Sequence, residues 1–230
     1  MIKIREVSKI INNKIINENI NINVKKSNIY GILGPNGAGK TTLIRQIMDF
    51  IKPTEGEIKL NEIISWNNSK LIMEETEYVA GEIILFDEMT GEKYLNFMKQ
   101  YKKINENQYI EELILKFDLK DILKIKVKKM SKGQKQKIAI IAALMNKPKI
   151  LILDEPTSGL DPLMQNVFNE VIQDLVKLGT AVLLCSHIFE EVAKLFNFVG
   201  FLKYGKIIKK IEINNKNVNQ LEQDFLSLYK

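Results

Sequence analysis

The chain is 230 residues long and carries 34 Lys and Arg against 28 Asp and Glu, a formal net charge of +6. This length suits one domain that folds without disulfides, and the single cysteine, Cys185, ends an apolar run and is expected in the core. No apolar run approaches the roughly 18 residues of a membrane span, and charges stand where a signal peptide needs its apolar stretch, so we expect a protein that does not cross a membrane. The lysines are scattered without interleaved aromatic residues, so we interpret the positive charge as a solvated face and expect no nucleic-acid partner.

The N-terminal part of the chain is predicted to form strands and then a helix. Residues 2–7 and 20–24 alternate apolar and polar positions around an Asn-containing turn, a pattern typical of antiparallel strands. Residues 29–33 form a short apolar strand that leads into a glycine-rich turn, and residues 41–50 have helical spacing. A strand, a glycine loop and a helix therefore stand in order.

The rest of the chain predicts a helical insertion and a return to strands. Another turn and strand reach residue 60, and residues 82–146 are expected to form a mainly helical lobe. Apolar strands return at residues 150–153, 181–184 and 198–202, with a helical stretch at 163–178, and a last helix is expected at 215–230. The predicted fold class is α/β, with a parallel sheet covered on both faces, a small N-terminal antiparallel β region and an inserted α-helical lobe.

The glycine-rich turn has the spacing of a phosphate-binding loop: Gly, four residues, then Gly-Lys-Thr, between a strand and a helix. Glycines let successive backbone N–H groups point inward, and the following helix presents its positive end to phosphate. Lys40 supplies a charge for the β- and γ-phosphates, and the Thr41 hydroxyl is a ligand suited to Mg²⁺. The residues expected to hold the phosphates are Gly34, Asn36, Gly37, Ala38, Gly39, Lys40, Thr41 and Thr42.

Two carboxylates follow the apolar strand at residues 150–153. Carboxylates at the carboxyl end of a parallel strand face the crevice where ligands bind. Asp154 is therefore expected to hold Mg²⁺, and Glu155 to orient or deprotonate the water that attacks the γ-phosphate. Asp-Glu after a strand is by itself a weak signal, and the glycine loop strengthens it.

Four motifs in order give the chain a family resemblance. Lys40 to Thr42, the segment Ser131-Lys132-Gly133-Gln134, the segment from Leu153 to Asp161, and His187 resemble the nucleotide-binding subunit of ABC transporters over essentially the whole chain. The Ser-Lys-Gly-Gln piece is that family's signature and separates it from most other phosphate-loop NTPases. The resemblance implies a P-loop NTPase core that binds ATP and Mg²⁺ and hydrolyses ATP.

The resemblance also implies a composite site in a head-to-tail dimer, formed with a second copy or a related ATPase subunit. ATP would lie between the glycine loop of one subunit and the signature residues Ser131, Gly133 and Gln134 of the other. Ser131 stands where a helix is predicted to begin, so a helix N-terminus would point at the anion. Asp161 would lie in the loop that crosses the interface, and His187 would contact the γ-phosphate.

Three positions depart from the family pattern. Lys132 stands where the signature has glycine, and it either faces solvent or adds charge near the phosphate. Gly81, followed by Glu82, stands where a linker glutamine is expected, which puts a Mg²⁺ and coupling contact in doubt. Ile11 takes the place of the aromatic residue that stacks on adenine, so base recognition is expected to be loose and apolar.

Residues 88–95 and 221–229 either resemble stand-alone ATPase subunits of peptide, antibiotic or polysaccharide exporters or are simply amphipathic helices packed on the core. The resemblance implies a separately encoded transmembrane permease, with this chain at the inner face of the cell membrane. Residues 83–86 are either its docking patch or part of the core. Two other functions remain open: an ABC protein acting on nucleic acid or the ribosome, which usually needs two cassettes or a long coiled coil, and a regulatory subunit that no longer hydrolyses ATP.

Overall fold

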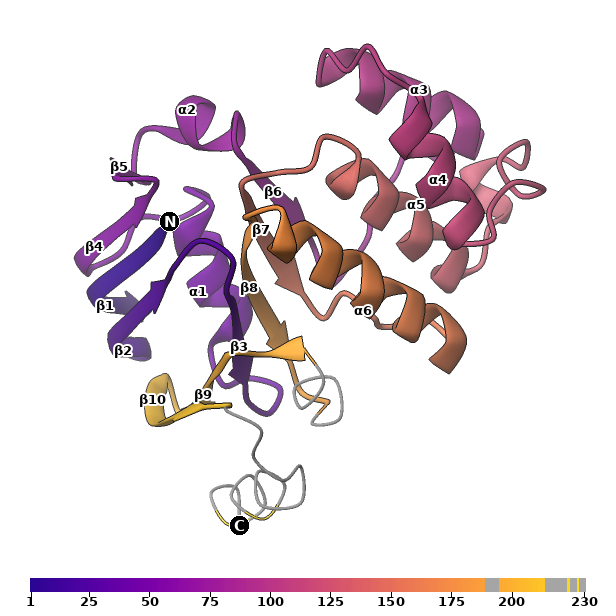
Figure 1. Ribbon diagram of the computed structural model, residues 1–230. Coiled ribbons are helices and arrows are strands. Elements are labelled where there is room, and N and C mark those ends of the chain that lie inside the picture. Colours follow the sequence, from indigo (N-terminus) through magenta and orange to yellow (C-terminus); the bar gives the residue numbers. More distant parts are fainter. Residues whose placement is uncertain (189–194, 214–222, 224–226, 228–230) are drawn as a thin grey trace. The chain divides into compact units, whose positions relative to one another are not determined.

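The computed structural model describes residues 1–188, 195–213, 223 and 227, and its ribbon is drawn in Figure 1. The chain forms two compact units: a core unit of residues 1–78, 149–155 and 176–230, and a helical unit of residues 79–148 and 156–175. All but two positions of the helix expected at 215–230 lie outside the described residues. Within the described part of the chain, no helix is long and apolar enough to span a membrane.

The first sheet of the core unit is antiparallel, with its strands in the order β2-β1-β4-β5. Its strands are β1 (Ile2–Ile11), β2 (Lys14–Val24), β4 (Glu55–Leu60) and β5 (Ile63–Ile64). Asn12 and Asn13 join β1 to β2 with φ angles of 48° and 60°, as a two-residue hairpin turn requires. The predicted antiparallel region is confirmed, but both strands run longer than expected because the ladder continues past register shifts that interrupt the alternation.

The second sheet is mainly parallel, in the order β10-β9-β3-β8-β7-β6. Its strands are β3 (Ile29–Leu33), β6 (Thr76–Val79), β7 (Ile150–Asp154), β8 (Ala181–Ser186), β9 (Phe198–Lys203) and β10 (Lys206–Glu212). Every residue of β3, β7 and β8 is buried, which explains their continuous apolar sequences. The predicted parallel sheet is confirmed, and it also carries an antiparallel edge strand, since β10 pairs antiparallel with β9 through a tight turn at Tyr204 and Gly205.

Helix α1 (Lys40–Ile47) contacts strands of both sheets in the core unit. Leu43, Ile44 and Ile47 are fully buried and join the apolar faces of the two sheets in one core. Cys185 belongs to this core as predicted, and burial raises the pKa of its thiol. A short helix, α2 (Ser69–Met73), also belongs to this unit.

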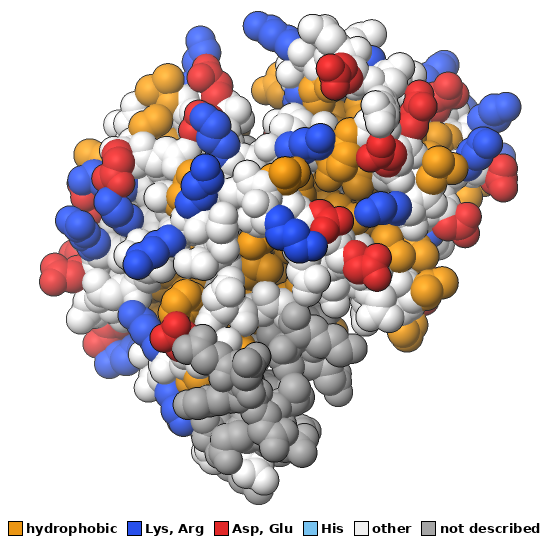
Figure 2. Space-filling model, viewed as in Figure 1, with side chains coloured by type: hydrophobic (Ala, Val, Ile, Leu, Met, Phe, Trp, Pro, Cys, Tyr) orange, Lys and Arg blue, Asp and Glu red, His pale blue; other side chains and the backbone are white. Residues whose placement is uncertain are grey.

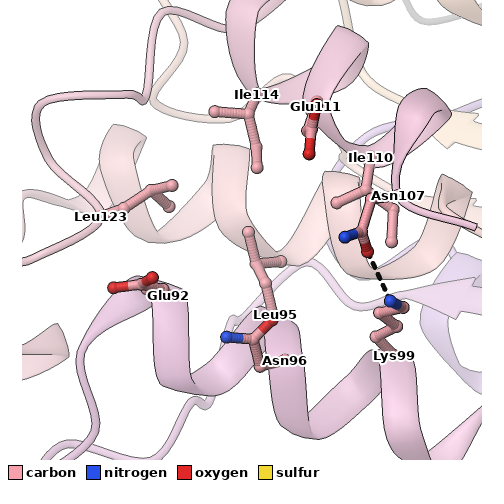
Figure 3. A pocket seen from close by; sticks show the side chains of 9 residues that line it. All are labelled: Glu92, Leu95, Asn96, Lys99, Asn107, Ile110, Glu111, Ile114 and Leu123. Atoms are coloured by element: carbon pink, nitrogen blue, oxygen red, sulfur yellow. Dashed lines mark hydrogen bonds between the residues drawn. The ribbon is translucent and has the colours of Figure 1, made fainter.

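The helical unit contains α3 (Gly91–Tyr101), α4 (Gln108–Lys116), a 3₁₀ turn (Val127–Lys129), α5 (Lys132–Leu144) and most of α6 (Pro162–Lys177). A loop of residues 102–107 separates α3 from α4. Helix α5 packs against α3 and α4, and its largely apolar second half is buried. A hollow of about 240 Å³ involves α3 and α4, and Figure 3 shows its aliphatic and polar lining around Leu95 and Ile110.

Charges of both signs are spread over the face of the molecule in Figure 2, where Lys and Arg alternate with Asp and Glu. Oppositely charged side chains also form ion pairs in the core unit, such as Lys3 with Glu62 and Lys206 with Glu18. The excess of positive charge is therefore not gathered into one patch on this face. This distribution agrees with the interpretation of a solvated basic surface.

Candidate functional site

A cleft of about 350 Å³ in the core unit is built around the glycine loop. It is lined by Ile16, by residues 35–42 and by Asp154 and Glu155. Gly37 and Gly39 have φ angles of 81° and 104°, which other residues rarely adopt. A Cβ atom on Gly34 would lie 2.4 Å from the carbonyl oxygen of Leu202, so the chain passes where only glycine fits. The loop runs directly into the N-terminus of α1, whose positive end favours an anion.

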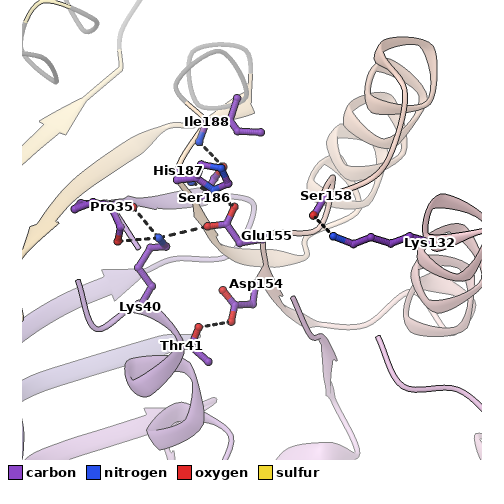
Figure 4. A network of polar contacts seen from close by, with 11 residues as sticks. Pro35, Lys40, Thr41, Lys132, Asp154, Glu155, Ser158, Ser186, His187 and Ile188 are labelled. Atoms are coloured by element: carbon purple, nitrogen blue, oxygen red, sulfur yellow. Dashed lines mark hydrogen bonds and ion pairs between the residues drawn. The ribbon is translucent and has the colours of Figure 1, made fainter. Parts of the chain in front are cut away.

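Lys40 is buried, and its charged end is held inside the loop. Its Nζ donates to the carbonyl oxygens of Gly34 at 2.7 Å and Pro35 at 3.3 Å. The same atom lies 3.4 Å from Glu155 Oε1, and Figure 4 shows the two side chains pointing toward one another. The loop therefore positions one cation over the cleft, where a phosphate would meet it.

Thr41 and Asp154 place two oxygen ligands side by side. The Thr41 hydroxyl donates to Asp154 Oδ2 at 2.8 Å, while Asp154 Oδ1 is buried and has no hydrogen-bond partner. Burial raises the pKa of Asp154 and the nearby charge of Glu155 adds to this, against the lowering effect of the Thr41 hydrogen bond. A divalent cation would satisfy the free oxygen and favour the charged carboxylate, so these residues fit Mg²⁺. No cluster of three or more His, Cys, Asp or Glu suited to a metal occurs among the described residues, so a metal here would also need phosphate or water ligands.

Glu155 and His187 meet at the carboxyl ends of β7 and β8. Glu155 Oε2 lies 2.7 Å from His187 Nδ1 and accepts from the His187 backbone N–H at 3.4 Å. Glu155 itself has a φ angle of 48°, a left-handed conformation that is costly for a residue with a Cβ. This strained backbone directs the carboxylate into the cleft beside Lys40.

The signature segment lies in the helical unit at the start of α5. Ser131 is the N-cap: its Oγ accepts from the Gln134 N–H at 3.2 Å, and Gln134 Oε1 accepts from the Ser131 N–H at 2.9 Å. The Ser131 hydroxyl hydrogen remains able to donate to another acceptor. A Cβ on Gly133 would lie 2.4 Å from the Gly159 carbonyl oxygen, so glycine is required there by packing within this unit.

Lys132 and Asp161 have local partners in the same unit. Lys132 is exposed, and its Nζ donates to Ser158 Oγ at 2.9 Å (Figure 4), a contact that neither sequence interpretation of this lysine anticipated. Asp161 Oδ1 accepts from the Met164 N–H at 2.9 Å and so caps the start of α6, where Pro162 is the first helical residue.

The remaining sequence departures lie outside the cleft lining. Gly81 is partly buried and Glu82 exposed in the bend that follows β6, and Ile11 is an exposed residue at the end of β1. Sequence reasoning missed two residues that support the loop. Ile16 lines the cleft, and Asn17 is fully buried and donates through Nδ2 to the Gly39 carbonyl oxygen at 3.2 Å. No local signal marks Asn17, because Asn also stands at positions 19, 21 and 23 of the same strand.

A glycine loop with a buried lysine, beside two carboxylates at the end of a parallel strand, defines a phosphate-loop NTPase of the ATP-binding type. The family model for ABC transporters matches residues 17–158, more than half of the chain, so this protein belongs to the ABC transporter family. It is the ATP-binding subunit of such a transporter and hydrolyses ATP for transport.

Relatives and solved structures agree with this assignment. The lantibiotic transport ATP-binding protein SrtF of Streptococcus pyogenes is 33% identical over 222 residues, which cover 96% of this chain and 95% of that protein. The bacitracin transport ATP-binding protein BcrA of Bacillus licheniformis is also 33% identical, over 94% of this chain and 71% of its own length. A solved dimeric bacterial ABC transporter cassette is 25% identical over 93% of this chain and 99% of that chain, with a TM-score of 0.84. An ATP-binding subunit of an ABC transporter, 24% identical with a TM-score of 0.89, shows the same fold over 98% of this chain and 99% of that chain.

Proposed function

We propose that the cleft of the core unit binds Mg²⁺–ATP and hydrolyses it, with Glu155 as the base that acts on the attacking water. The observation that carries this proposal is the placement of Glu155 between Lys40 and His187, with one carboxylate oxygen toward each. A carboxylate so held lies beside the lysine that meets the γ-phosphate and is oriented by a second side chain.

Each polar group of the cleft has a role in this proposal. Lys40 exchanges its contact with Glu155 for the β- and γ-phosphates when ATP enters. The backbone N–H groups of residues 36–42 and the N-terminus of α1 hold the remaining phosphate charge. His187, whose Nδ1 is engaged by Glu155, has its other ring nitrogen available for the γ-phosphate.

Thr41 and Asp154 would hold the metal ion. The buried and unpaired Oδ1 of Asp154 and the Thr41 hydroxyl supply protein oxygens, and Mg²⁺ in such sites is completed by phosphate oxygens and water. Bound there, the ion would neutralise charge on the β- and γ-phosphates.

The ATP site is completed by a second subunit in this proposal. Ser131, at the N-terminus of α5, would donate its hydroxyl hydrogen to the γ-phosphate held by the partner's glycine loop, with Gly133 and Gln134 beside it. Asp161 would lie close to the same interface. The dimeric cassette among the similar structures supports this arrangement.

The named relatives support a proposal for the cargo and the membrane partner. SrtF and BcrA are transport subunits for a lantibiotic and for bacitracin, so we propose that this chain drives export of a peptide antibiotic or a similar amphiphile. Its partner would be a separately encoded permease, which keeps the chain at the inner face of the cell membrane. The relatives favour this function over one on nucleic acid or the ribosome.

Replacing Asp154 by Asn tests the metal site. In the parent, ATP should raise the melting temperature more with Mg²⁺ than with EDTA, and in the variant this difference should vanish. The nucleotide-free variant should melt at a higher temperature than the parent, because a buried carboxylate with an unpaired oxygen is removed. The exposed Asp121→Asn serves as control and should behave as the parent. A full Mg²⁺ effect in Asp154→Asn would contradict the assignment.

A further inference from the structure

Two amide side chains are fully buried beneath the glycine loop. Asn17 of β2 and Gln46 of α1 each have 0% of their surface exposed, although both side chains are polar. Gln46 Nε2 donates to Asn17 Oδ1 at 2.9 Å and to the Thr42 carbonyl oxygen at 3.2 Å. Asn17 Nδ2 donates in turn to the Gly39 carbonyl oxygen at 3.2 Å. The backbone carbonyl oxygens of Gly39 and Thr42 can only accept hydrogen bonds, so the amide nitrogens of Asn17 and Gln46 must face them. The orientation of both side-chain amides is therefore fixed.

We propose that Asn17 positions the peptide group between Gly39 and Lys40 for phosphate binding, with Gln46 as the hydrogen-bond donor to its buried amide oxygen. A trans peptide is planar, so its C=O and N–H point in opposite directions. The Gly39 oxygen accepts from Asn17 Nδ2 and from the Leu43 N–H at 3.0 Å, and both of its lone pairs are engaged. The Lys40 N–H of the same peptide is thereby turned away from Asn17 and toward the cleft that Lys40 lines.

The local geometry shows why this peptide needs a second anchor. Gly39 has a φ of 104°, and glycine moves through this region at little cost. The Asn17 amide occupies the space beside it: a Cβ on Gly39 would lie 2.7 Å from Asn17 Nδ2. The helical bond from Leu43 alone leaves the peptide free to tilt, and the Asn17 bond from the side of β2 removes that freedom.

The polar pair is hard to explain as packing. Gln46 Oε1 is buried without a hydrogen-bond partner, which costs stability, and two apolar side chains of similar volume would avoid that cost. Proteins tolerate such a loss of stability at residues that serve binding, and these two side chains contact the backbone of the phosphate loop. Asn17 would act through the loop backbone, so it is a positioning residue, and the inference rests on the proposed role of the loop in phosphate binding.

The test is the double replacement Asn17→Leu with Gln46→Met, compared with Gln46→Met alone. Replacing both partners by apolar groups should leave the melting temperature unchanged or higher. The dissociation constant for ATP should rise about tenfold in the double variant, because roughly the binding energy of one hydrogen bond is lost. The KM for ATP should rise as well, while kcat at saturating ATP stays within about twofold of the parent. Gln46→Met retains the Asn17 to Gly39 bond and should bind ATP within about twofold of the parent.

Two outcomes would overturn the inference: parental ATP affinity in the folded double variant, or equal losses in the double variant and in Gln46→Met. If the double variant does not fold, Asn17→Asp decides. Its side chain keeps the volume and still accepts from Gln46, but as a carboxylate it turns an oxygen toward the Gly39 carbonyl. ATP affinity should then be lowered, and it should recover relative to the parent as the pH falls and the buried acid regains a proton to donate. Parental affinity at all pH values would overturn the inference.

A readout without nucleotide separates this inference from the proposed function. In the NMR spectrum of the nucleotide-free protein, the Lys40 amide resonance should move or broaden in the double variant and stay at its parental position in Gln46→Met. An unmoved Lys40 amide in the double variant would overturn the positioning role of Asn17. Lack of ATP binding by the parent would instead overturn the proposed function.

Discussion

Glu155 Oε2 lies 2.7 Å from His187 Nδ1, which joins the carboxyl ends of β7 and β8 at the edge of the glycine loop. The other oxygen of the same carboxylate lies 3.4 Å from Lys40 Nζ. One strained residue thus contacts both the cation expected to meet phosphate and the histidine expected to contact it. Removing the charge of Glu155 should affect chemistry more than ATP binding.

Glu155→Gln should separate ATP binding from ATP hydrolysis. Glutamine keeps the size and a hydrogen bond to His187 but cannot take a proton from water, so turnover should fall by about 10² to 10⁴. ATP affinity should remain close to that of the parent. Steady-state phosphate release and ATP titration measure the two quantities, with the exposed Glu55→Gln as control. Hydrolysis by Glu155→Gln at the parental rate would show that Glu155 is not the base.

Lys40→Ala should abolish stabilisation by ATP. The change removes the cation that the Gly34 and Pro35 carbonyls hold over the cleft, so binding should weaken by about 2–3 kcal/mol. The ATP-induced rise in melting temperature, measured at a fixed ATP concentration, should disappear. Lys25→Ala, at an exposed position, should leave the rise intact. An unchanged rise in Lys40→Ala would falsify the phosphate role of this lysine.

The elements around the nucleotide could be predicted from sequence because each has a strong local signal. The glycine loop is recognised because it lies between the apolar run of β3 and the helical spacing of α1. Strand β7 is recognised as an apolar run that ends at two carboxylates. The strands and helices that were missed are mostly short: β5, α2 and β6 have two, five and four residues. Segments of that length carry too few positions for a period to show.

Asn17 escaped prediction for a different physical reason. Ile20, Ile22 and Val24 of β2 are buried, and simple alternation from them places residue 17 on the exposed face. In the structure Val7 pairs with Ile20 but Lys9 pairs with Asn17, so β2 carries one extra residue between these two pairs. Across this bulge the alternation shifts by one position, so the odd-numbered residue Asn17 is buried although the buried residues from 20 to 24 are even-numbered. The bulge turns Asn17 inward to Gly39, and only long-range pairing reveals it.

Ser131→Asp, introduced together with Glu155→Gln, should prevent ATP-dependent dimerisation. Aspartate retains the N-cap of α5, so the helix should stay intact, but its charge would repel the γ-phosphate held by the partner. Ser131→Asn is the matched control, since it caps the helix equally well without a charge. Sedimentation with ATP should show dimers for Glu155→Gln alone and for the Asn variant, and monomers for the Asp variant. An ATP-dependent dimer of the Asp variant would contradict the composite site.

The segment of residues 83–86 is not wholly part of the core, because two of its four side chains are exposed. Ile84 is 87% exposed and Phe86 53% exposed in the loop that precedes α3. The Phe86 ring packs on Phe97 and Tyr94 with centroid distances of 5.8 Å and 6.1 Å, which fixes the loop on the helical unit. Neighbouring exposed apolar side chains on a fixed loop suit a partner surface, and we expect the permease there.

Ile84→Asp should therefore separate folding from coupling. Because the Ile84 side chain is almost entirely in water, a carboxylate there should leave the melting temperature and the basal ATPase of the isolated subunit unchanged. In the presence of the membrane subunit, the same variant should lose co-purification and transport, since docking would bury an unpaired charge. Phe86→Asp should also lose the partner, with some loss of stability from its aromatic contacts. Leu115→Asp, at a 64% exposed position of α4, should keep both partner binding and transport. A folded Ile84→Asp variant that still co-purifies with the permease would exclude this segment as the docking surface.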